Sequence, residues 1–129
     1  MDYSFLIEQA KQARGNSYSP YSQFRVGAAL LAKSGKVYQG CNVENTAYGD
    51  TVCAERIAFF KAISEGEREF SAIAIVGGKD KIVFCPPCGS CRQVMSEFCS
   101  PDFCVIFYDG EDIRTQTLES LLPFSFEVK

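Results

Sequence analysis

The chain contains no histidine. Its absence excludes Ser-His-Asp and Cys-His catalysis, and it also excludes every metal site that uses an imidazole ligand. Proton transfer must therefore fall to Glu, Asp, Lys, Tyr, Cys or bound water.

The sequence also lacks a basic N-terminal segment of the kind that opens a secretory signal, and it has no apolar run long enough to span a bilayer. It has 13 basic residues against 16 acidic ones, a net charge of −3, which offers no cationic surface for a phosphate backbone. We therefore expect small-molecule partners, with no nucleic acid polymer and no membrane. The seven cysteines are an odd number, and without a secretory signal they indicate a cytoplasmic protein with reduced thiols kept for metal or packing.

A length of 129 residues fits one domain over 1–129. Hydrophobic periodicity predicts helices at 3–14, 53–64, from 87 through at least 98, and 117–122. The same patterns predict strands at 24–32, 37–44, 71–76 and 103–108, with a further edge strand near the end. The short turn at 33–36 makes the first two strands an antiparallel hairpin. This order predicts a three-layer α/β/α sandwich, with fold class α/β and a mixed sheet.

The second of these helices is expected to begin near Cys53. Either Asp50 or Thr51 can cap it, and its spacing places Ile57, Phe60 and Ile63 on one face.

Three cysteines have the spacing of a metal site: Cys53 is followed by the pair Cys88 and Cys91 in a Pro-Cys-Gly-Ser-Cys segment. A zinc ion with only three protein ligands keeps its fourth place for water, which separates a catalytic centre from a closed structural one. Both cysteine groups fall where a strand is followed by a helix, and the N-terminus of a helix favours thiolate over thiol. Glu55, two residues after Cys53, is then the natural proton carrier. Elsewhere such a residue would be read as a solvated acid in the first helical turn.

A closed site with four sulfur ligands is the alternative, and it would make the chain a non-catalytic zinc module. Cys85 is the serious candidate for the fourth ligand, although two prolines stiffen the turn between it and Cys88. We expect Cys41, Cys99 and Cys104 to be small core residues.

Several segments of the chain resemble the short, homotetrameric cytidine deaminases. The resemblance rests on residues 17–30, 42–45, 53–56, 87–93 and 121–123, which include Cys-Ala-Glu-Arg and Pro-Cys-Gly-Ser-Cys-Arg-Gln. It implies hydrolytic deamination of cytidine and deoxycytidine to uridine and deoxyuridine, with release of ammonia. It also implies one Zn²⁺ per subunit at Cys53, Cys88 and Cys91, and Glu55 as a proton carrier that does not bind the metal.

Further residues are candidates for binding the nucleoside. Asn42 and Glu44 share one side of the strand predicted at 37–44, where an amide and a carboxylate suit a sugar hydroxyl. The pattern alone fits an exposed polar face equally well, but the resemblance implies the ribose 3′-hydroxyl. It also implies that Phe24 lines the site and that the main chain at Ala54 contacts the pyrimidine.

Three thiolates leave a divalent metal site with net negative charge, which calls for a nearby cation. We expect Arg56 to donate hydrogen bonds to the ligand sulfurs, because groups outside the ligand shell tune a metal site.

Tyr48 and Phe126 match positions that the family contributes across subunit boundaries, which implies a homotetramer. Phe124 stands where a small residue is expected, which leaves two alternatives, Phe124 or Phe126, for the side chain that enters a neighbour's pocket. The alternative within the same chemistry is a sister zinc deaminase that acts on another aminated ring, such as blasticidin-S deaminase.

Overall fold

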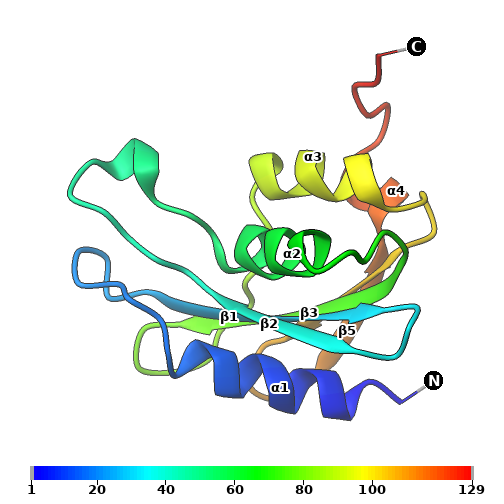
Figure 1. Ribbon diagram of the computed structural model, residues 1–129. Coiled ribbons are helices and arrows are strands. Elements are labelled where there is room, and N and C mark those ends of the chain that lie inside the picture. The colour runs from blue at the N-terminus through cyan, green and yellow to red at the C-terminus, as the bar shows by residue number, and fades with distance from the viewer. Residues whose placement is uncertain (1, 129) are drawn as a thin grey trace.

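The computed structural model describes residues 2–128, and in it a five-stranded mixed sheet lies between two layers of helices (Figure 1). The strand order is β2-β1-β3-β4-β5. The strands are β1 (Arg25–Ala32), β2 (Val37–Cys41), β3 (Phe70–Gly78), β4 (Cys104–Tyr108) and β5 (Ile113–Thr117). Only β3 and β4 pair in parallel, while the other neighbours are antiparallel. The predicted hairpin, mixed sheet and late edge strand are confirmed.

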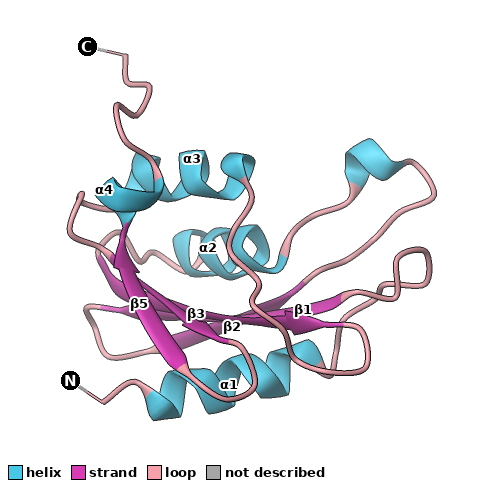
Figure 2. Cartoon of the chain, turned by 180° about the vertical axis from the view of Figure 1, so that it is seen from behind, coloured by secondary structure: helices cyan, strands magenta, loops and turns pink. Residues whose placement is uncertain are grey.

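Helix α1 (Ser4–Arg14) covers one face of the sheet. Helices α2 (Ala54–Ser64), α3 (Gly89–Phe98) and α4 (Leu118–Leu121) lie on the opposite face (Figure 2). Two apolar clusters fill the spaces between these layers, one on each face. The three-layer α/β/α fold is therefore confirmed. Within residues 2–128, no helix has the length and apolar character needed to span a membrane.

The buried face of α2 differs from the prediction. Phe60 is 47% exposed, and Ile57 and Ile63 are only half-buried. The helix instead packs on the sheet through the face of Ala54, Ala58, Phe59 and Ala62. Three of these four side chains are single methyl groups, so the helix axis can come close to the strands. Of the three apolar residues predicted to face the core, Phe60 is left on the outer side of the helix.

The start of α2 also differs from the prediction. Asp50 belongs to a short 3-10 helix, η1 (Tyr48–Asp50), and Thr51 follows it, so neither caps α2. Cys53 is the N-cap, and it makes no side-chain capping hydrogen bond. Strand β2 ends at Cys41, three residues earlier than predicted.

Two glycines allow helices to lie directly on the backbone of the β1–β2 hairpin. A Cβ atom on Gly27 would lie 2.0 Å from the Ala10 carbonyl oxygen of α1. A Cβ atom on Gly40 would lie 2.3 Å from the Ala54 carbonyl oxygen of α2. Neither approach is possible with a side chain in place, so both helix layers depend on these positions.

We predict that Gly27→Ala lowers the free energy of unfolding by about 1–3 kcal/mol or more, because the new methyl group meets helix backbone that must shift. Gly89→Ala is the matched control, since a Cβ atom there meets nothing within 4 Å. Urea unfolding of both variants measures the difference. Equal stabilities would show that the close approach at Gly27 is not a constraint.

Candidate functional site

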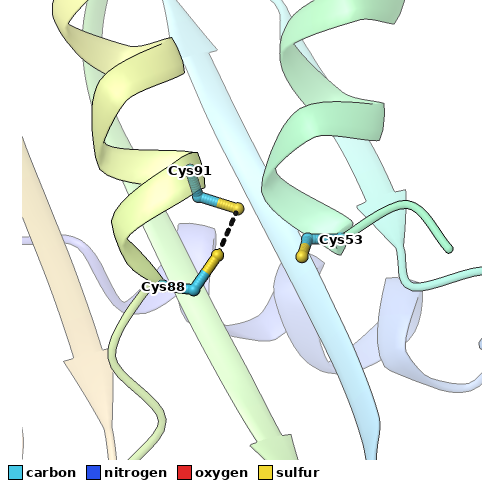
Figure 3. A group of neighbouring side chains, drawn as sticks. All are labelled: Cys53, Cys88 and Cys91. Atoms are coloured by element: carbon cyan, nitrogen blue, oxygen red, sulfur yellow. Dashed lines mark hydrogen bonds between the residues drawn. The ribbon is translucent and has the colours of Figure 1, made fainter. Parts of the chain in front are cut away.

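The loops that carry the cysteines leave the sheet at the same end. Strands β2 and β3 are both antiparallel to β1 and therefore run in the same direction. The chain after β2 leads to Cys53, the N-cap of α2, and the chain after β3 leads to Cys88, the N-cap of α3. Cys91 follows in the first turn of α3 (Figure 3). The sulfur atoms of Cys53, Cys88 and Cys91 all lie within 4.8 Å of one another.

This arrangement of sulfur atoms fits zinc. Tetrahedral Zn–S bonds of about 2.3 Å place the sulfurs about 3.8 Å apart. The Cys88 and Cys91 sulfurs are 3.5 Å apart. Small movements of the side chains would therefore bring all three to ligand distance.

Among residues 2–128, no fourth cysteine sulfur belongs to this cluster. Cys85 packs instead against β3, where a Cβ atom on Gly77 would meet its Sγ atom at 2.7 Å. Cys99 and Cys104 pack against the apolar clusters as expected, although both remain half-buried. The geometry favours the open three-cysteine site over the closed alternative.

Arg56 lies beside the first of these cysteines. Its Nη2 atom is 3.6 Å from the Cys53 sulfur and 3.4 Å from the Thr51 carbonyl oxygen. Its Nε atom is buried without a hydrogen-bond partner. The Cys91 sulfhydryl and Arg56 together lower the pKa of Cys53, which favours its thiolate form. The expected contact of Arg56 with a ligand sulfur is present at Cys53.

Glu55 is not a solvated acid, because its side chain is only 5% exposed. Burial raises the pKa of Glu55 to about 7, and the charge of Cys53 adds to this effect. A carboxyl with a pKa near neutrality can both hold and release a proton, as general acid–base catalysis requires. The alternative of a solvated first-turn acid is therefore wrong.

Asn42 and Glu44 follow the end of β2 and keep the predicted alternation. Both are buried, at 8% and 7% exposure, while Val43 between them is 41% exposed. The alternative of an exposed polar face is therefore wrong. Their side chains instead face the segment 17–26, which leads into β1.

Hydrogen bonds fix the Asn42 amide. Its oxygen accepts the Val26 N–H at 2.9 Å and the Ser17 hydroxyl, and its nitrogen donates to the Phe24 carbonyl at 2.8 Å.

The Glu44 carboxylate accepts the N–H groups of Tyr21 and Ser22 at 3.0 and 3.1 Å, and also the Ser22 hydroxyl. These bonds, with the hydroxyl first, lower the pKa of Glu44. Sequence reasoning singled out neither Ser17 nor Ser22. The only signal for them was the density of hydroxyl groups in residues 17–22.

Phe24 and Ala54 are two further predicted substrate contacts. Phe24 is half-buried, and its ring lies over β3, where a Cβ atom on Gly77 would meet it at 3.2 Å. Ala54 is the first residue of α2, so its N–H has no partner within the helix.

The comparisons with known proteins agree with this site. Residues 1–107 match the model of the cytidine and deoxycytidylate deaminase zinc-binding region. The chain belongs to this deaminase family. It is 50% identical over 127 residues to a cytidine deaminase of Sporosarcina psychrophila, a match that covers 98% of this chain and 92% of that protein.

Solved structures of the family share the fold. A cytidine deaminase from Burkholderia pseudomallei superimposes with a TM-score of 0.89 at 48% identity, covering 98% of this chain and all of that one. The Mycobacterium tuberculosis cytidine deaminase gives a TM-score of 0.85 at 38% identity, covering 99% of each chain. A blasticidin-S deaminase of Bacillus cereus is more distant, at 32% identity over 94% of this chain and 89% of that protein.

Two of the residues that the resemblance to this deaminase family singled out lie on protruding segments. Tyr48 is 68% exposed on η1, within an arm formed by residues 43–52 that extends from the body (Figure 1). Phe126 is 73% exposed on the C-terminal tail, which runs beyond α3. Phe124 is fully exposed and has a φ of 53°, a conformation that suits glycine. The fold of a single chain thus presents these aromatic side chains outward.

We predict that Cys91→Ala abolishes stoichiometric zinc binding, because two remaining thiolates do not hold the ion in a deaminase centre of this kind. Cys99→Ala is the control, since that thiol is outside the cluster. Metal analysis of the purified variants measures the effect. X-ray absorption of the wild-type protein adds a count of sulfur ligands, and a count of four would contradict the open site.

We predict that Glu55→Gln stabilises the metal-free protein increasingly as pH rises from about 4.5 to about 7. The pKa of Glu55 is raised in the folded state from 4.5 to about 7, so wild-type stability from this group is complete below 4.5 and is lost through this window. The relative gain of the variant reaches as much as about 3 kcal/mol. Urea unfolding of both proteins in chelator, between pH 4 and pH 8, measures it. A constant difference across this range would contradict the burial of an ionisable carboxyl.

Proposed function

We propose that the protein is a zinc-dependent cytidine and deoxycytidine deaminase that releases ammonia and forms uridine or deoxyuridine. The observation that carries this proposal is a three-cysteine cluster beside a buried carboxyl whose pKa lies near 7. The relatives named cytidine deaminase support the substrate class, since they match nearly the whole chain at up to 52% identity.

Zinc bound by Cys53, Cys88 and Cys91 would supply acidified water as the nucleophile at the ring carbon that bears the amine. Glu55 moves the protons. It takes one from the water and gives it to the adjacent ring nitrogen, then takes the remaining proton of the added hydroxyl and passes it to the exocyclic amine, which leaves as ammonia. Arg56 beside Cys53 offsets the negative charge of the thiolates.

The other proposed contacts hold the nucleoside. Asn42 and Glu44 bind the ribose 3′-hydroxyl, and Phe24 lies against the base. The free N–H of Ala54 faces the pyrimidine from the first turn of α2. The burial of Asn42 and Glu44 at the same end of the sheet as the cysteines supports this arrangement.

We also propose that the chain works as a single catalytic domain over 1–129, in a homotetramer in which Tyr48 and Phe126 complete a neighbour's site. Their exposure on an arm and a tail supports this, as does the exposed Phe60 on the outer side of α2. The cytoplasm is the proposed location, because a thiolate centre with seven free cysteines needs a reducing environment.

The proposal is tested by incubating the zinc-loaded protein with cytidine and following ammonia release. We predict turnover that a chelator removes and that added zinc restores. Glu55→Gln should lose about 10²- to 10⁴-fold in rate while it keeps its zinc, because only the proton carrier has changed. Near-normal turnover by this variant would remove Glu55 from the mechanism. Blasticidin S is the comparison substrate, and its preferential deamination would reassign the substrate.

A further inference from the structure

We propose that Ser22 is a positioning residue for the nucleoside site. Its hydroxyl holds both the side chain of Glu44 and the backbone of Phe24 in place. This inference rests on the proposed function, because it concerns the residues assigned there to the nucleoside. Ser22 itself is assigned no contact with the substrate.

The chemistry of a hydroxyl fixes the direction of these bonds. The Phe24 N–H donates to the Ser22 oxygen at 2.9 Å, so that oxygen acts as an acceptor there. A hydroxyl has only one proton to donate, and the Glu44 carboxylate receives it. The lowered pKa of Glu44 keeps that carboxylate ionised at neutral pH. The hydroxyl therefore connects a buried anion to the backbone N–H of Phe24, two residues further along the chain.

Phe24 is held from its other side as well. Its carbonyl accepts the Asn42 amide at 2.8 Å, so both backbone polar groups of Phe24 bind a side chain. Gln23, between Ser22 and Phe24, has a φ of 60°, a left-handed conformation that is strained for a non-glycine residue. The three proposed nucleoside contacts thus form one hydrogen-bonded unit, and the Ser22 hydroxyl is the link between two of them.

The Tyr21 and Ser22 N–H groups hold Oε1 of the Glu44 carboxylate, while Oε2 accepts only the Ser22 hydroxyl among the described residues. This carboxylate has no salt-bridge partner among the described residues, where the single ion pair joins Lys11 and Glu8. Removing the Ser22 hydroxyl would leave one carboxylate oxygen and the Phe24 N–H without these bonds. Unpaired buried groups move toward water or other partners, and an ionised group is the most sensitive to such a loss. We therefore expect Oε2 of Glu44 to turn away from the position that binds the 3′-hydroxyl, while the two N–H groups still hold Oε1.

The chain provides a matched control with the same hydrogen-bond pattern far from the site. Ser34, in the turn between β1 and β2, donates to the Glu67 carboxylate at 2.6 Å and accepts the Lys36 N–H at 3.4 Å. It therefore joins a glutamate to the N–H two residues later, as Ser22 does. Ser34→Ala removes an equivalent hydroxyl without touching the proposed nucleoside contacts.

The experiment measures nucleoside binding by calorimetry in zinc-loaded Glu55→Gln protein, in which turnover of cytidine is expected to be about 10²- to 10⁴-fold slower. Cytidine is compared with 3′-deoxycytidine in this background and after adding Ser22→Ala, Ser22→Thr or Ser34→Ala. We expect the 3′-hydroxyl to strengthen binding by about tenfold in the background protein, the effect of one hydrogen bond to a charged group. Ser22→Ala should reduce that ratio to about twofold, while Ser22→Thr and Ser34→Ala should retain it.

The outcomes separate the inference from the proposed function. A general loss of structure would weaken both nucleosides equally, so an unchanged ratio in Ser22→Ala would overturn the positioning role while the deaminase activity stands. Should Ser22→Ala not fold, Ser22→Cys carries the same prediction, because a thiol is a weak donor. Absence of cytidine binding and of turnover in the zinc-loaded wild-type protein would overturn the proposed function itself.

Discussion

The site depends on the convergence of two helix N-termini at one end of the sheet. Helix α2 brings Cys53 and helix α3 brings Cys88 and Cys91, so the distance between the helices decides whether three sulfurs can share one ion. Helix α2 owes its position to Gly40, against which the backbone of its first turns lies. The metal centre is thus built from packing distances between secondary-structure elements as much as from its ligands.

Because the chain has no histidine, cysteines alone determine the charge of the metal centre at the two helix N-termini. A site made only of thiolates gathers negative charge, and its neighbours reflect this. Arg56 lies beside Cys53 as a counter-charge, and burial next to the same thiolate keeps Glu55 partly protonated near neutral pH. Helix N-termini contribute in the same direction, since their dipoles favour anions. The proposed proton carrier, Glu55, therefore has its acidity set by burial beside the same cysteine cluster.

Sequence reasoning predicted the layers of the fold, the hairpin and the cysteine cluster, because hydrophobic periodicity and ligand spacing are local signals. It misjudged the buried face of α2, since large apolar residues at helical spacing outweighed the alanines that actually touch the sheet. It placed the cap of α2 on Asp50 or Thr51, since it did not foresee the η1 turn. The hydrogen bonds of Ser17 and Ser22 could not be predicted, because they join residues 22 to 25 positions apart whose alignment depends on the completed sheet.

The internal hydrogen bonds of the Glu44 carboxylate limit the directions from which a ligand can donate a hydrogen bond to it. A carboxylate offers about four lone-pair directions. Its own chain takes three of them, through two N–H groups and one hydroxyl. One direction is left for an outside donor, so in the proposed nucleoside site a sugar epimer with its hydroxyl on the opposite face would find no acceptor there. Saturation of the carboxylate would then give that proposed site stereochemical selectivity without a steric barrier.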